Sequence, residues 1–220
     1  MAVMCVYCGN RLGNTRDHVP PQNLFPKPKL VNMVTVPSCE ECQASFKKDE
    51  DVFMAWITFG PAGESPAGKL LWEQKLKRTY EKDGGIKKVI ARSFKQVNLE
   101  TPAGIYAGKK LVISIDPERK NKVLRKIARG LFWVEYKERL PENIPIEIYG
   151  IHGKDEILYE LIGLTNEATT AWEGIFEYRH VREPKHFESY WIMSFFRRNY
   201  FVAIVNDTES TKEMKEVHNE

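Results

Sequence analysis

The four cysteines of the chain form two C-x-x-C pairs, Cys5 with Cys8 and Cys39 with Cys42, and thirty residues separate the pairs. Thiolate sulfur is a preferred ligand of zinc, and each C-x-x-C turn presents two sulfurs on one side. The spacing therefore predicts one tetrahedral, structural zinc site made by all four thiolates. A redox-active pair and a site that has lost its metal are the alternatives.

An Asp-His pair, Asp17 and His18, lies between the two cysteine pairs in the segment RDHVPP. A neutral imidazole, with a pKa of about 6.5, can accept a proton from water near neutral pH. One zinc site, held by the cysteine pairs before and after this segment, would fix the loop that carries His18. The alternative is a turn aspartate beside a histidine that only supports the zinc site.

About the first 50 residues resemble the cysteine-bearing branch of the HNH endonuclease family. The resemblance lies in the order of four segments, CVYC, RDHVPP, NMVTVPSC and CEEC. The resemblance implies a treble-clef ββα fold in which the four cysteines hold structural zinc. It also implies that His18 is the general base and that Asp17 binds a catalytic Mg²⁺ or Mn²⁺ ion.

Two further site residues follow from the same resemblance. Asn32 matches the middle Asn of the family, which braces the loop bearing the histidine. Gln43 stands where many members carry a His or Asn metal ligand, and its carbonyl oxygen can bind a hard cation with a longer reach. Ser45, Lys47 and Asp49 are alternative ligands in the next helical turns.

The activity implied by the resemblance is metal-dependent hydrolysis of phosphodiester bonds in DNA, with His18 activating water. RNA or a nucleotide is an alternative substrate. The rival is an inactive zinc-binding module that binds nucleic acid or a protein partner, and Gln43 favours this rival. The sequence contains no H-E-x-x-H motif and no phosphate-cradling glycine loop.

The elements expected around these residues begin with a short strand in MVTVPSC and a helix from about Glu40 to Gly60. Helical patterns follow in KLLWEQKLKRTYEKDGG, in IKKVIARSFKQV and most clearly in PERKNKVLRKIARGLFWVEYKERLP, with a β-hairpin in NLETPAGIYAGKKLVISID. Antiparallel strands are expected from IPIEIYGI onward. The sequence predicts an α+β chain, with a zinc-stabilised treble-clef module at 1–59, a larger helix-plus-antiparallel-sheet domain at 60–206 and a polar tail at 207–220.

Charge is unevenly distributed along the chain, although its net value is only +3. Seventeen Lys and Arg face six Asp and Glu between Lys69 and Arg129, which suits either a polyanion or a solvated helix face. His180 and His186, in the polar segment YRHVREPKH, are expected at a solvated edge, and contact with phosphate alongside Arg179 and Arg182 is the alternative. No apolar run reaches the roughly 18–20 residues of a membrane span and no leader pattern begins the chain, so a cytoplasmic protein is expected.

Overall fold

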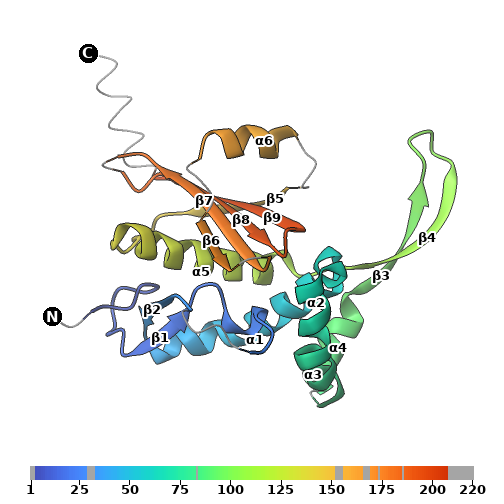
Figure 1. Cartoon of the computed structure of the whole chain (residues 1–220), viewed down its shortest axis with the longest axis horizontal. Helices are drawn as coiled ribbons and strands as arrows, with labels where there is room; N and C mark the ends of the chain where they lie inside the picture. Colours follow the sequence, from blue (N-terminus) through green and yellow to red (C-terminus); the bar gives the residue numbers. More distant parts are fainter. Residues whose placement is uncertain are drawn as a thin grey trace.

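The computed structural model describes residues 3–28, 33–82, 84–151, 156–165, 169–172, 174–184 and 186–207. Within these residues helices combine with antiparallel sheets, which confirms the predicted α+β class (Figure 1). The elements in chain order are β1 (Thr15–His18), η1 (Gln22–Leu24), β2 (Thr35–Ser38), α1 (Glu40–Phe59), η2 (Pro61–Glu64), α2 (Pro66–Leu71), η3 (Trp72–Leu76), α3 (Lys77–Lys82), α4 (Gly84–Ser93), β3 (Phe94–Glu100), β4 (Tyr106–Ile113), α5 (Pro117–Tyr136), β5 (Ile146–Ile151), α6 (Glu156–Gly163), β6 (Thr169–Trp172), β7 (Phe176–Arg182), β8 (Ser189–Phe195) and β9 (Asn199–Val205).

The N-terminal part is a β-hairpin followed by a long helix. Strands β1 and β2 pair antiparallel, with Asp17 opposite Val36 and His18 opposite Thr35. Helix α1 begins directly after β2, because the Cys39 sulfur caps it by accepting a hydrogen bond from the Cys42 backbone N–H at 3.4 Å. This cap fixes the first turn of α1 beside the hairpin.

Helix α5 lies on one face of the five-stranded sheet, whose order is β5-β9-β8-β7-β6, and α6 lies on the other (Figure 1). Asp116 caps the N-terminus of α5, and Pro117, which has no N–H to satisfy, follows in its first turn. The helix ends where Lys137 adopts a left-handed conformation, at φ 55°. Apolar residues spaced four apart along one side of α5, including Val123, Ile127 and Leu131, are buried against the neighbouring elements.

One hydrophobic core joins the residues before and after position 60. Phe53 of α1 contacts Phe195 and Phe201 of the large sheet, with ring centroids 5.5 and 6.5 Å apart. Trp191, in the aromatic segment of β8, is fully buried in this core. The division of the chain at 59/60 stays a prediction, as does the polar tail, most of which lies outside the described residues.

The segment IKKVIARSFKQV, predicted to be helical throughout, changes from helix to strand in the middle. Helix α4 ends at Ser93, and Phe94 begins β3, where it pairs with Ile113 and packs on Phe59 at 5.6 Å. Strands β3 and β4 form a two-stranded ribbon that projects from the rest of the molecule (Figure 1). In the described part of the chain, no helix combines the length and apolar character that a membrane span requires.

Candidate functional site

The four cysteines meet at one place, as predicted. Their sulfur atoms all lie within 4.8 Å of one another, and Cys8 and Cys39 are 3.9 Å apart. Four thiolates around zinc at about 2.3 Å would lie about 3.8 Å from one another, so the cluster has the size of a tetrahedral metal site. None of the four forms a disulfide. The cluster can therefore hold a metal ion such as zinc.

The cluster connects the N-terminal turn to helix α1. Cys5 and Cys8 lie in a tight turn that Gly9 closes, with its N–H bonded to the Cys5 carbonyl and a positive φ of 66°. Burial acts to raise the pKa of Cys5, but backbone N–H groups outweigh it and lower that pKa to about 7. Burial raises the pKa of Cys39 and Cys42. Four thiolates this close repel one another, so a bound cation is what would keep them all ionised.

An open groove of about 490 Å³ lies between the β1–β2 hairpin and one face of α1. His18 enters it from the end of β1, and Gln43, Lys47 and Asp51 enter it from successive turns of the helix. The groove is also lined by the carboxylates of Asp17, Glu40 and Glu50; among the described residues that line it, Lys47 is the one cation. Asp17 and Glu50 are paired with Lys126, and Glu40 and Asp51 leave the groove with a net negative charge, which attracts cations and repels a bare phosphate.

Asn23 lines this groove with an amide group whose oxygen is buried. Its Nδ2 donates a hydrogen bond to Oδ1 of Asp51 at 3.0 Å, which orients the amide. Its Oδ1 is buried and accepts no hydrogen bond from the described residues. Amide and carboxylate oxygens are the ligands that hard divalent cations prefer. Asn23 and Asp51 thus form a donor set suited to such a cation.

The other predicted metal ligands lie on different sides of α1. Gln43 lies in the groove, where its Nε2 donates to the Arg16 carbonyl at 3.0 Å. Ser45 donates to the Cys42 carbonyl, and Asp49 forms ion pairs with α5 on the opposite side of the helix. The predicted bracing residue Asn32 lies outside the described residues.

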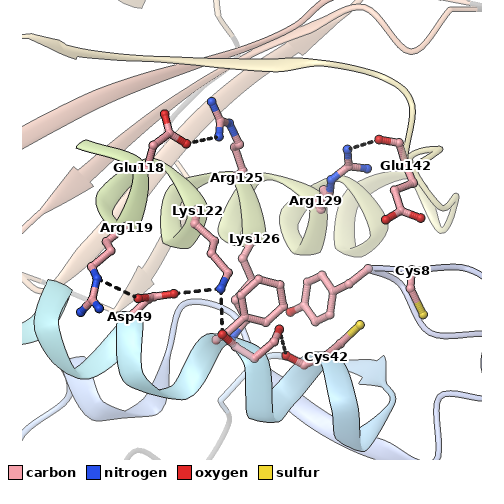
Figure 2. A pocket seen from close by; sticks show the side chains of 13 residues that line it. Cys8, Cys42, Asp49, Glu118, Arg119, Lys122, Arg125, Lys126, Arg129 and Glu142 are labelled. Carbon is pink, nitrogen blue, oxygen red and sulfur yellow. Dashed lines mark hydrogen bonds and ion pairs between the residues drawn. The ribbon is translucent and has the colours of Figure 1, made fainter. Parts of the chain in front are cut away.

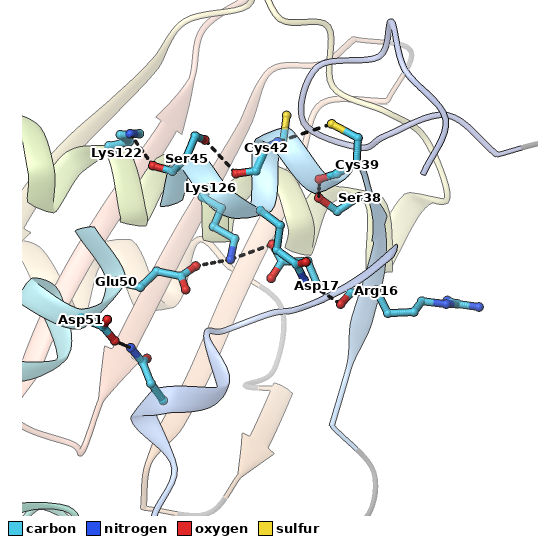
Figure 3. A network of polar contacts seen from close by, with 12 residues as sticks. Arg16, Asp17, Ser38, Cys39, Cys42, Ser45, Glu50, Asp51, Lys122 and Lys126 are labelled. Atoms are coloured by element: carbon cyan, nitrogen blue, oxygen red, sulfur yellow. Dashed lines mark hydrogen bonds and ion pairs between the residues drawn. The ribbon is translucent and has the colours of Figure 1, made fainter. Parts of the chain in front are cut away.

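Asp17 lies in a buried ion pair rather than at an open position in the groove. One of its carboxylate oxygens is 2.7 Å from Nζ of Lys126, whose side chain is 1% exposed. Glu50 contacts the same Nζ from the other side (Figure 3). Burial raises the pKa of Glu50, with Lys126 acting in the opposite direction. Asp17 and Glu50 thus connect β1 and α1 to helix α5.

A second hollow of about 660 Å³ lies between α1 and α5, and the basic side chains of α5 border it (Figure 2). Lys122 and Arg119 form ion pairs with Asp49, and Arg125 pairs with Glu118. Arg129 donates to four backbone carbonyls of the loop that follows the helix, those of Leu140, Pro141, Glu142 and Ile144. Three of the seventeen basic residues between Lys69 and Arg129, namely Arg119, Lys122 and Arg129, thus hold α5 to its neighbours.

His180 is buried, so the expected position at a solvated edge is wrong for this residue. Its Nδ1 is 2.7 Å from the Tyr136 hydroxyl, and its Nε2 is 3.4 Å from a carboxylate oxygen of Glu135. The ring also stacks on Trp191, with centroids 4.8 Å apart. Burial lowers the pKa of His180, and Glu135 partly offsets this effect. These contacts place the histidine in a network between α5 and the sheet.

Three residues of the site, Asp51, Asn23 and Lys126, were not predicted from the sequence. Asp51 lies eight positions after Gln43, so the helical period alone would have put both on one face of α1. Asn23 follows the two prolines after His18, where the polar residues of a turn could have been considered. Lys126 carries no such signal, because it lies in a distant helix and meets Asp17 only in the folded chain.

No protein-family model matches the chain, and neither a curated protein nor a solved structure does. Function is therefore inferred from the groove and from the thiol cluster beside it.

Proposed function

We propose that residues 1–59 are a treble-clef ββα module of the HNH type, and that the chain is a metal-dependent endonuclease acting on DNA. One observation carries the proposal. His18 shares an open groove with the oxygen donors Asn23 and Asp51, beside a four-thiol cluster that fixes the start of α1. An imidazole and hard-cation ligands in one groove are the groups that phosphodiester hydrolysis needs.

Each group has a distinct role in this proposal. The four thiolates hold structural zinc, which keeps the turn at Cys5 and the start of α1 together. His18 accepts the proton of the attacking water, and Lys47 contacts the phosphate. Asp51 and Asn23 would hold a Mg²⁺ or Mn²⁺ ion, which would offset negative charge on the phosphate and on the leaving oxygen when bound. Gln43, eight residues before Asp51 on α1, instead braces β1 through its bond to the Arg16 carbonyl.

Asp17 takes a positioning role in this scheme instead of the ligand role that the sequence suggested. Its carboxylate is 2.7 Å from the Lys126 ammonium, and that contact fixes the strand residue immediately before His18. A carboxylate paired in this way has less negative charge to offer a cation. Asp51, on the facing helix, is the carboxylate we assign to the metal.

The rival function is a zinc module that binds DNA without cutting it. Two observations favour it: the Gln43 amide is bonded to the Arg16 carbonyl, and Asp17 is paired with Lys126. Both contacts occupy groups that the HNH resemblance assigns to a catalytic metal.

Nicking of a supercoiled plasmid in Mg²⁺ or Mn²⁺ separates the two functions. We expect the wild-type chain to nick the plasmid and His18→Ala to be about 10²- to 10⁴-fold slower, because it lacks the general base. His186→Ala is the matched control, since His186 does not line the groove. A wild-type chain that binds the plasmid without nicking it would establish the rival. Full activity in His18→Ala would exclude His18 as the base.

The metal ligand is tested separately with Asp51→Asn. We expect this variant to need a higher Mg²⁺ concentration for half-maximal nicking, because it offers one charged ligand fewer. Asp49→Asn is the control from the opposite side of α1 and should leave the Mg²⁺ dependence unchanged. Equal Mg²⁺ dependence in wild type and Asp51→Asn would remove Asp51 from the cation site.

A further inference from the structure

Strands β3 and β4 form an arm, residues 94–113, and within the described structure they pair only with each other. The arm projects away from the sheet and from α5 (Figure 1). Large apolar side chains are exposed along it, among them Leu99 at 41%, Ile105 at 65% and Tyr106 at 57%. An isolated two-stranded hairpin is only marginally stable in water. A binding partner that covers the arm would stabilise it.

The charge of the arm and of the preceding helix α4 identifies the kind of partner. Residues 84–113 contain six Lys and Arg against one acidic residue, Glu100. All six cations have exposed side chains, and none of them is buried as Lys126 of α5 is. The six cations are Lys87, Lys88, Arg92, Lys95, Lys109 and Lys110.

The register of the arm places cations and apolar groups on the same face. Lys95 lies opposite Val112 and Lys110 lies opposite Val97, so both lysines share a face with the two valines. Two copies of this chain would bring these like charges together, which opposes pairing of one arm with another. The phosphates of a nucleic acid would instead neutralise them.

We propose that the β3–β4 arm and α4 grip duplex DNA outside the groove, an inference that rests on the proposed nuclease function. A two-stranded ribbon fits the grooves of a duplex, and its lysines can contact the flanking phosphates. The tip, with Pro102 and the exposed Ile105, provides apolar contacts of the kind that enter a minor groove. The arm thus supplies affinity and the groove at His18 supplies the chemistry.

The dimensions of the molecule give a length requirement. Asp51 and Phe59 are separated by eight residues of α1, about 12 Å of helix. A strand of seven or eight residues adds about 23–27 Å beyond the root of the arm. At about 3.4 Å per base pair, the arm alone spans about seven base pairs. Duplexes too short to reach both the groove and the arm should therefore bind more weakly than 30-base-pair duplexes.

The test measures binding of the full chain to a fluorescent 30-base-pair duplex in EDTA at several salt concentrations. The variant combines Lys95→Gln, Lys109→Gln and Lys110→Gln. We expect at least tenfold weaker binding and a salt-dependence slope shallower by about two to three, because three phosphate contacts are lost. The control removes three exposed cations elsewhere, by Lys69→Gln, Lys137→Gln and Arg198→Gln, and should bind as wild type does.

A second variant, Ile105→Ser, tests the tip without changing charge. We expect several-fold weaker binding with an unchanged salt slope, and circular dichroism is used to check that both arm variants fold. Binding equal to wild type in both arm variants would overturn the proposal, as would an arm that instead mediates a dimer seen by sedimentation. The outcomes also separate the two proposals. Arm-dependent binding without plasmid nicking rejects only the nuclease, and nicking with unchanged binding in the arm variants rejects only the arm.

Discussion

Lys126 carries a buried positive charge between the carboxylates of Asp17 and Glu50. Replacing it by methionine keeps most of the volume but leaves two carboxylates without their cation. Breaking a buried ion pair in this way costs about 3–5 kcal/mol, and we expect Lys126→Met to lower the free energy of unfolding in urea by that amount. Lys122→Met is the control, because its pair with Asp49 is partly exposed and such pairs contribute about 1 kcal/mol or less. Equal losses in the two variants would contradict the role assigned to Lys126.

His180 gives the pH dependence of stability a definite sign. Burial lowers its folded-state pKa below the ordinary value of 6.5. The stability from its neutral form is present above pH 6.5 and is lost as the pH falls through the folded-state pKa. We expect the difference in unfolding free energy between wild type and His180→Gln to be largest above pH 7 and to shrink toward pH 5. A difference that grows in acid would mean that the pair with Glu135 dominates instead.

The sequence predicted the roles of residues whose spacing along the chain determines where they meet. It did not predict the roles that depend on contacts between distant parts of the chain. The two C-x-x-C pairs predicted one cluster because each turn fixes its own sulfurs. Asp17 was expected to be a metal ligand because the segment RDHVPP resembles the HNH motif. Its partner Lys126 was not visible, since 109 positions separate the two residues.

At the scale of elements, α5 was the clearest prediction, and its N-cap can be tested directly. The Asp116 side chain accepts a hydrogen bond from the Glu118 backbone N–H at 3.0 Å. Removing such a cap costs about 1 kcal/mol, within a range of about 0.5–2. We expect Asp116→Ala to lose this amount in urea unfolding and Asp116→Asn, which keeps a capping oxygen, to lose little. Equal losses in both variants would show that the cap oxygen is not what stabilises α5.

The segment IKKVIARSFKQV was predicted to be helical throughout, and its change to a strand has a physical cause at this same scale. The pattern IKKVIARSFKQV has helical spacing, and nothing local marks an end after Ser93. Phe94 leaves the helix because it pairs with Ile113 and packs its ring on Phe59, two contacts with distant parts of the chain. Tertiary packing of this kind overrides local propensity.

At the scale of the whole molecule, the core determines whether the metal cluster and the large sheet unfold together. Phe53 connects α1 to β8 and β9 through Phe195 and Phe201, and the ion pairs of Lys126 connect β1 to α5. A chain with one continuous core unfolds as one cooperative unit, and different probes then report the same midpoint. We expect metal release, followed with a chromophoric zinc indicator, and tryptophan fluorescence to change at one urea concentration.

Phe53→Ala tests that coupling from the core, since truncating a buried Phe costs about 3–5 kcal/mol. If one core serves the whole chain, the variant lowers the midpoint of both probes equally, although Phe53 is not one of the residues that would hold the metal. Val97→Ala, on the exposed arm, is the control and should move neither midpoint. Two separate wild-type transitions, with only the fluorescence midpoint lowered in Phe53→Ala, would instead support independent domains divided near residue 59. In that case the thiol cluster would stabilise the groove without help from the sheet, and His18 would keep its position after the rest of the chain had unfolded.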